Sequence, residues 1–162
     1  MKAVFILIMV MMISGCTTPL TGTNNTIIVN ANRTGSPEMY PNPQLTPGDI
    51  LETNITIICT VGYTATVRDV PLSVRKYVFQ EYGKEYPQLF GTYEVDHFIP
   101  LELGGSNDIT NLWFEPAPGY KLKDKVENWL HDQVCKHGMN ISEAQNIIVD
   151  DWYAVYLTVN QI

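Results

Sequence analysis

The clearest pattern of apolar and polar positions lies in the C-terminal third of the chain. Between Lys121 and Cys135 the apolar residues recur at steps of three and four, which places them on one face of a helix: Leu122, Val126, Trp129, Leu130 and Val134. Gly138 follows, and glycine is a typical residue just beyond a helix end. The pattern predicts an amphipathic helix over residues 121–135.

A second helix is predicted directly after the first. Ser142 and Gln145 have the spacing of a capping box, in which two side chains satisfy free backbone N–H groups at a helix start. The apolar positions behind this start again fall on one face: Ala144, Ile147, Ile148, Trp152 and Val155. We expect this face to be buried.

The middle of the chain shows a mixed pattern. Residues 72–82 have apolar positions on one helical face, and Gly83 can end that helix. Residues 93–103 and 109–114 indicate two strands joined by a turn over residues 104–108. Residues 62–68 alternate as in a short strand, whereas residues 50–59 fit a helix or a strand equally well. The predicted fold class is α+β, a small hairpin wrapped by helices.

The first sixteen residues have a different character. Lys2 precedes an unbroken run of eleven apolar residues, which is too short to span a bilayer as a helix but fits a secretory signal peptide. The run ends in Ile13-Ser14-Gly15-Cys16, which resembles the lipobox of prokaryotic lipoproteins. That resemblance implies a signal peptide over residues 1–16 and a lipid on Cys16. The alternative is an uncleaved N-terminal anchor, and both interpretations place the remainder outside the cytoplasm, attached to the cell membrane.

Residues 17–45 are rich in Thr, Asn, Pro, Gly and Ser, which is typical of a flexible polar tether. Thr46-Pro47 has the form of a helix cap followed by proline at the first helical position, so we expect the folded domain to cover residues 46–162. Without Lys2 the chain has 9 basic and 17 acidic residues, a net charge of −8. Such a charge disfavours DNA as a partner, because affinity for phosphate comes largely from Lys and Arg.

Cys59 and Cys135 remain once Cys16 is assigned to the anchor. In an oxidising compartment an even pair of cysteines predicts a disulfide, and two free buried thiols are the alternative. The 76-residue separation gives a disulfide about 4 kcal/mol of stabilisation in the chain-entropy description.

The segment with the most chemistry is Glu94 to Gly105, followed by Asn111-Leu112. In it Asp96 offers a hard oxygen ligand for a divalent cation, and His97 offers an imidazole that can take a proton from water near neutral pH. Neighbouring side chains of a strand point to opposite faces, so the two can share a site where the backbone bends. Asn111, fourteen residues after His97, can bond across the turn and hold its shape.

Four pairs in this segment match the ββα-metal finger of HNH endonucleases in order and spacing: Asp96-His97, Pro100-Leu101, Gly104-Gly105 and Asn111-Leu112. Further matches extend over roughly residues 46 to 156 and include Glu115-Pro116, Lys123 to Asn128, His131 and Cys135. The chain therefore resembles a family of small exported bacterial HNH-endonuclease-like proteins. The resemblance implies a ββα-metal hairpin and helix, with additional helices around it.

The resemblance also implies roles for individual residues. Asp96 would bind a divalent metal (Mg, Mn or Zn), His97 would be the general base that activates water, and Asn111 would shape the loop and orient His97. HNH enzymes carry a further His or Asn ligand at the helix start, where this chain has Tyr120 and Lys121.

Neither Tyr120 nor Lys121 suits a cation, so other ligands are needed. Glu127 and His131 lie one helical turn apart and are the candidate replacements. The alternative for His131 is a surface ion pair or a bond to the hairpin backbone.

Two functions follow from this sequence. The first is a membrane-anchored, extracytoplasmic nuclease that hydrolyses phosphodiester bonds with a divalent metal. The second is a non-catalytic cell-envelope scaffold or binding lipoprotein that retains a degenerate finger, with an unknown protein or glycan partner. A hydrolase of another ester is a weaker third interpretation, because no Gly-x-Ser-x-Gly motif is present.

Overall fold

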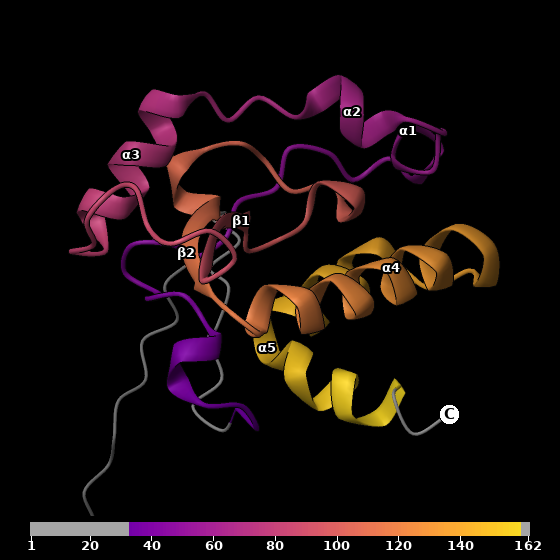
Figure 1. Cartoon of the computed structure of the whole chain (residues 1–162). Helices are drawn as coiled ribbons and strands as arrows, with labels where there is room; N and C mark the ends of the chain where they lie inside the picture. The colour runs from indigo at the N-terminus through magenta and orange to yellow at the C-terminus, as the bar shows by residue number, and fades with distance from the viewer. Residues whose placement is uncertain (1–32, 160–162) are drawn as a thin grey trace, which may run out of the picture.

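The computed structural model describes residues 33–159, so the expectations for the signal peptide and for Cys16 lie outside the described residues. The described range contains five α-helices and one two-stranded antiparallel sheet, which confirms the α+β class (Figure 1). None of the helices within it is both long enough and apolar enough to cross a membrane.

The two strands form a short hairpin at the centre of the fold. Strand β1 (Tyr93–His97) pairs with β2 (Leu112–Pro116), with Tyr93 opposite Pro116 and His97 opposite Leu112. Both strands are shorter than the sequence predicts. Two 3₁₀ turns, η2 (Leu101–Leu103) and η3 (Ile109–Asn111), lie in the connection, and Pro100 just before η2 has no N–H for a ladder.

The glycine pair in this connection allows the chain to pass close to itself. A Cβ on Gly104 would lie 2.0 Å from the carbonyl oxygen of Glu52, and one on Gly105 would lie 1.8 Å from that of Ile99. Gly104 also has a φ of +82°, which side chains rarely tolerate. The Gly104 carbonyl accepts hydrogen bonds from the N–H groups of Leu51 and Glu52, so this approach fastens residues 50–52 to the hairpin loop.

Two long helices pack side by side beneath one face of the hairpin (Figure 1). They are α4 (Gly119–His137) and α5 (Ile141–Val159), at the two places where the sequence predicts helices. Helix α5 is kinked at Asp151, whose φ of −161° and ψ of 74° are not helical. Their facing residues form the main core: Val126, Leu130, Val134, Ala144, Ile148 and Trp152. The predicted cap is wrong by two residues, since the side chain of Asn140 accepts the Ser142 N–H and the helix already begins at Ile141.

The other face of the hairpin is covered by α3 (Leu72–Glu81), as Val78 and Phe79 pack against Leu112 and Phe114. Residues 50–59 contain the single turn α1 (Ile55–Ile58). The predicted strand over residues 62–68 is instead the helix α2 (Tyr63–Val67). The described range places no strand beside this segment to pair with, and the Thr66 hydroxyl instead bonds the Tyr63 carbonyl within the helical turn.

Packed structure begins earlier than Thr46, so the expected tether does not extend over residues 33–45. Tyr40 is buried against Trp152, and Arg33 donates hydrogen bonds to the carbonyl oxygens of Val149 and Asp150. Thr46 does not cap a helix; its buried hydroxyl donates to the Leu112 carbonyl at 2.9 Å. Tertiary contacts with α5 and β2 order a segment whose composition alone resembles a linker.

Candidate functional site

The side chains of Asp96 and His97 point away from strand β1 toward different partners. The carboxylate of Asp96 contacts Lys123 on α4, whereas the ring of His97 contacts Asn107 in the connection between the strands. The divergence follows from the alternation of side chains along a regular strand, and β1 does not bend before His97. The two residues therefore bond to separate parts of the fold.

His97 is held as a buried, neutral imidazole. Its Nε2 lies 3.0 Å from Oδ1 of Asn107, and Nδ2 of Asn107 donates to the Val67 carbonyl at 2.7 Å. Because that bond fixes the amide with its oxygen toward the ring, Nε2 carries the proton and donates it. Burial lowers the pKa of His97 and outweighs the hydrogen bond with Asn107 and the charge of Asp96, which raise it. His97 is 2% exposed, so a substrate cannot reach its ring in this conformation.

Asn111 shapes the loop, as the resemblance implies. Its Oδ1 accepts the N–H of Ile99, and its Nδ2 donates to the carbonyls of Ile99 and Ser106, all at 2.9 Å. The side chain is fully buried. The expected orientation of His97 by this side chain is not seen, since the ring is bonded by Asn107 instead.

A buried ammonium lies between Asp96 and helix α4. Lys123 is 0% exposed, and its Nζ lies 2.8 Å from Oδ2 of Asp96 and 2.8 Å from the carbonyl oxygen of His97. The third partner is the carboxylate of Glu127, one turn further along α4. Three oxygen atoms thus surround one positive charge, which satisfies the three donors of a lysine.

Glu115 on β2 lies fully buried beside this group. Neither of its carboxyl oxygens has a hydrogen-bond donor, and burial raises the pKa of Glu115 well above its usual range. A protonated Glu115 becomes a donor itself and can bond to the Asp96 carboxylate. Burial also raises the pKa of Asp96, but the influences that lower it, chiefly the nearby Lys123 ammonium, outweigh burial, so that the pKa of Asp96 is lowered.

Glu127 is the second carboxyl group of the cluster whose pKa is raised. Burial raises its pKa to about 8, against the opposing effect of Lys123. Burial alone would lower the pKa of Lys123, but the surrounding carboxyl groups raise it well above its usual value. Burial thus favours the protonated forms of Glu115 and Glu127, whereas the ammonium of Lys123 favours the ionised form of Asp96.

This arrangement does not fit a divalent metal. A hard cation needs several ionised or neutral oxygen ligands, and the ionised carboxylate of Asp96 is already paired with an ammonium. The predicted ligand set of Asp96, Glu127 and His131 is not brought together, because Lys123 separates the first two and His131 lies elsewhere on α4.

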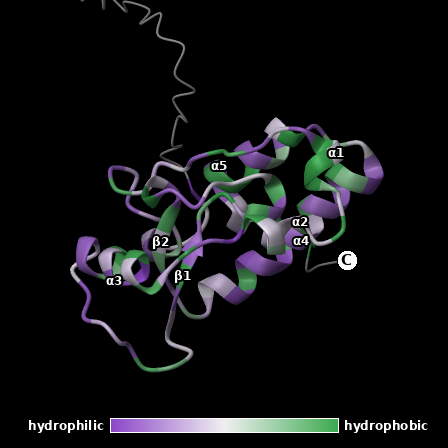
Figure 2. Ribbon diagram, turned by 90° about the horizontal axis from the view of Figure 1, so that it is seen from above, coloured by the Kyte–Doolittle hydropathy of each residue, from purple (hydrophilic) through white to green (hydrophobic). Residues whose placement is uncertain are grey.

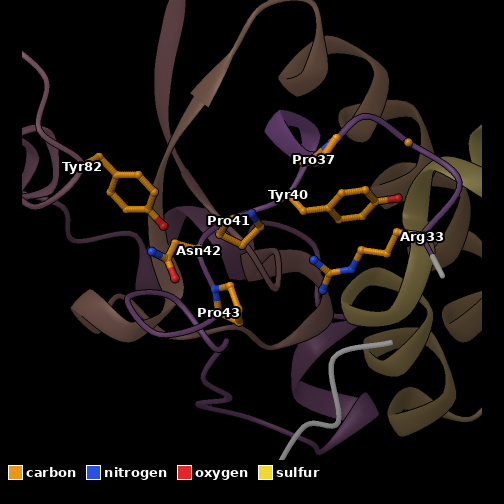
Figure 3. A pocket seen from close by; sticks show the side chains of 8 residues that line it. Arg33, Pro37, Tyr40, Pro41, Asn42, Pro43 and Tyr82 are labelled. Atoms are coloured by element: carbon orange, nitrogen blue, oxygen red, sulfur yellow. The ribbon is translucent and has the colours of Figure 1, made fainter. Parts of the chain in front are cut away.

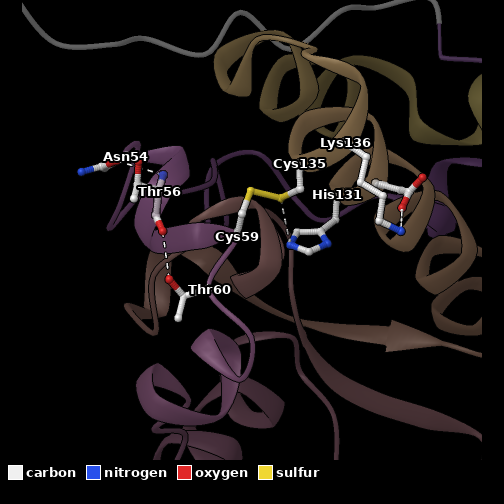
Figure 4. The surroundings of a disulfide bond; sticks show 8 residues. Asn54, Thr56, Cys59, Thr60, His131, Cys135 and Lys136 are labelled. Atoms are coloured by element: carbon white, nitrogen blue, oxygen red, sulfur yellow. Dashed lines mark hydrogen bonds and ion pairs between the residues drawn. A yellow bond between two sulfur atoms is a disulfide. The ribbon is translucent and has the colours of Figure 1, made fainter.

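His131 lies beside the disulfide. Cys59 and Cys135 are bonded with a Cα–Cα distance of 5.6 Å, which confirms the predicted pairing, and Nε2 of His131 lies 3.4 Å from Sγ of Cys135 (Figure 4). Within residues 33–159, these three side chains are the group of Cys, His and acidic residues whose ligand atoms could hold a metal ion. Both sulfurs are consumed by the disulfide in the conformation described.

The two described pockets lie away from the cluster of Asp96, Lys123 and Glu127. One of about 530 Å³ lies between the N-terminal segment and α3 and is lined by Arg33, Tyr40, Tyr82 and three prolines (Figure 3). The other, of about 390 Å³, is lined by α3 and the hairpin connection, including Tyr77 and Asn107. Neither pocket is lined by Asp96, His97 or Lys123.

Sequence reasoning missed three residues of the cluster and its surroundings: Asn107, Glu115 and Lys123. Helical spacing offered one signal, because Lys123 and Glu127 are four residues apart on a helix that follows the hairpin. Lys123 also lies one turn from Val126, on the boundary of the apolar stripe. Lysine is almost always exposed in folded proteins, so the sequence offered no reason to expect Lys123 to be buried in the cluster.

Searches of protein-family models, of curated proteins and of solved structures each found no match for this chain.

Proposed function

We propose that this chain is a non-catalytic lipoprotein of the cell envelope that keeps an HNH-like hairpin and helix as a scaffold for a partner outside the membrane. The observation that carries the proposal is the buried Lys123 ammonium between Asp96 and Glu127. The HNH resemblance would place a divalent cation beside Asp96, and a lysine side chain supplies the positive charge there. The three N–H donors of this ammonium are taken by Asp96, Glu127 and the carbonyl of His97, so none is left for water or phosphate.

The surroundings of His97 support the same proposal. A general base must reach the proton that it removes, directly or through one water. His97 is buried and its Nε2 donates to Asn107. The net charge of −8 expected after loss of the leader also repels a phosphodiester backbone.

A binding role is supported by apolar side chains on the surface around α1. Leu51, Ile55, Ile57 and Val61 are all exposed within eleven residues of chain, and the segment is strongly apolar (Figure 2). Exposed apolar residues that gather in one region are typical of protein-binding surfaces. The nearby disulfide between Cys59 and Cys135 ties this region to α4 and suits an oxidising compartment.

The test is a direct assay of metal binding and cleavage with the full, oxidised chain in detergent. We expect no nicking of supercoiled plasmid with Mg²⁺, Mn²⁺ or Zn²⁺, and no calorimetric binding of these ions that Asp96→Asn removes. Metal-dependent nicking that is lost in His97→Ala but kept in His137→Ala, a change of an exposed histidine on α4, would overturn the proposal and restore the nuclease interpretation.

A further inference from the structure

We propose that Cys59, Cys135 and His131 form a zinc site that becomes available when the disulfide is reduced. The site is distinct from the Lys123 cluster, and the inference does not depend on the scaffold proposal. It gives His131, which α4 places next to the sulfur of Cys135, the role of a metal ligand. The bound species would be a free divalent zinc ion.

The spacing of the ligand atoms fits zinc. All three lie within 4.8 Å of one another, and the distance between His131 Nε2 and Cys135 Sγ is 3.4 Å. In a tetrahedral site with Zn–S bonds of ~2.3 Å and Zn–N bonds of ~2.0 Å, sulfur and nitrogen ligands are ~3.5 Å apart and two sulfurs ~3.8 Å apart. The imidazole already has this distance to one sulfur.

The second sulfur can also reach a position suitable for zinc with little movement of the backbone. Cys59 directly follows α1 and Cys135 lies in α4, and their Cα atoms are 5.6 Å apart. Breaking the S–S bond allows the sulfurs to separate by rotation about the Cα–Cβ bonds. His131 and Cys135 are one helical turn apart on α4, so their relative position is fixed by the helix itself.

The fourth position of a tetrahedral site is left to water. The group of ligand atoms within 4.8 Å of one another consists of Cys59, His131 and Cys135 and contains no carboxylate oxygen. Two thiolates, one imidazole and one water make up a ligand set that zinc accepts.

A reductant can reach the disulfide, and the reduction and zinc-binding steps balance in electrons and protons. Cys59, His131 and Cys135 are each partly exposed, so a small dithiol can reach the disulfide. The dithiol gives two electrons and two protons to the disulfide and becomes a disulfide itself, which leaves two thiols on the protein. Zinc then binds the two sulfurs as thiolates and displaces two protons to solvent. Reoxidation joins the sulfurs again and releases the ion.

The experiment compares zinc binding by the oxidised and the reduced full chain, with a phosphine as the reductant because it competes weakly for zinc. We expect one zinc per reduced chain and none bound to the oxidised chain at these residues. His131→Ala should weaken binding to the reduced chain at least tenfold, whereas His137→Ala, two residues beyond Cys135, should not change it. Cobalt(II) in place of zinc should give the absorption of thiolate-to-metal charge transfer, which Cys59→Ser abolishes.

Near-UV circular dichroism distinguishes binding from unfolding. A reduced chain that loses its aromatic signal and regains it on addition of zinc would also support the site. A reduced chain that binds no zinc, or binds it equally tightly after His131→Ala, would overturn the inference.

Discussion

The ammonium of Lys123 lies 2.8 Å from the carboxylate of Asp96, and this contact joins helix α4 to strand β1 inside the protein. The resemblance to HNH enzymes predicts Asp96 as a metal ligand and gives Lys123 no such role. The Lys123 side chain of this ion pair is fully buried. Its ammonium also bonds to Glu127 and to the carbonyl oxygen of His97. An internal cation thus links the hairpin to the helix beneath it.

Lys123→Met should strongly destabilise the fold. Methionine has nearly the same length and removes the charge, so Asp96, whose side chain is 19% exposed, is left without its partner. Breaking a buried pair costs roughly 3–5 kcal/mol of unfolding free energy, and the partial exposure of Asp96 places the expected loss at the lower end of that range. Urea denaturation followed by far-UV circular dichroism measures the loss.

The matched control is Lys125→Met, an exposed lysine on the same helix that contacts the face of Tyr156. We expect it to change the unfolding free energy by about 1 kcal/mol or less. Equal effects of the two substitutions would contradict a special role for the Lys123 ammonium.

Lys123→Ala should create a binding site for a divalent cation. It removes the ammonium and opens space among Asp96, Glu115 and Glu127, whose carboxyl groups can then act as oxygen ligands. We expect Mn²⁺ or Ca²⁺ to bind this variant and to raise its melting temperature, more strongly as pH rises because the ligands must lose protons. Differential scanning fluorimetry with and without the ion tests this.

Lys123→Met, which fills the same space, serves as the control and should show no such response. The double variant Lys123→Ala with Asp96→Asn should lose it. A melting temperature of Lys123→Ala that no ion changes would argue against a cation position at this point of the fold.

Glu115→Gln should change how stability depends on pH. Burial raises the folded-state pKa of Glu115 above its unfolded value near 4.5, so its protonation stabilises the fold at low pH, and this contribution is lost as pH rises toward the folded pKa. Glutamine cannot ionise, so the variant should gain stability relative to the wild type between pH 5 and pH 8, by at most about 1.4 kcal/mol per pH unit.

Urea denaturation at several pH values measures this difference. Glu85→Gln, an exposed glutamate in the loop before β1, is the control and should show none. A constant difference between Glu115→Gln and the wild type over this range would mean that Glu115 does not titrate with folding.

Replacing both Cys59 and Cys135 by serine should lower the unfolding free energy by about 4 kcal/mol, because the bond closes a loop of 76 residues in the unfolded chain. The measurement is thermal or urea unfolding of the double variant beside the oxidised wild type. The reduced wild type should resemble the variant in the absence of metal. Equal stability of all three would show that the disulfide contributes nothing to folding.

The sequence by itself determined the elements whose patterns are local. The stripe from Leu122 to Val134 specified α4, and the glycine pair indicated the turn between the two strands. Asn111 was expected to fasten the loop, and its hydrogen bonds to Ile99 and Ser106 do so. The cysteine count specified the disulfide. Each of these depends on periodicity, on the conformational preference of a residue type or on a count of residues, and all three can be read from the sequence.

Only the tertiary structure decided which groups meet inside the protein. Neighbouring side chains of a strand point to opposite faces, so Asp96 and His97 on β1 contact different residues. The packing of α4 against the hairpin places Lys123, and not His131, next to Asp96. Residues 62–68 became helical and residues 33–45 became ordered through neighbours far away in sequence. The physical reason is common to all of these cases: charge pairing and burial depend on three-dimensional distance, and spacing along one chain does not define that distance.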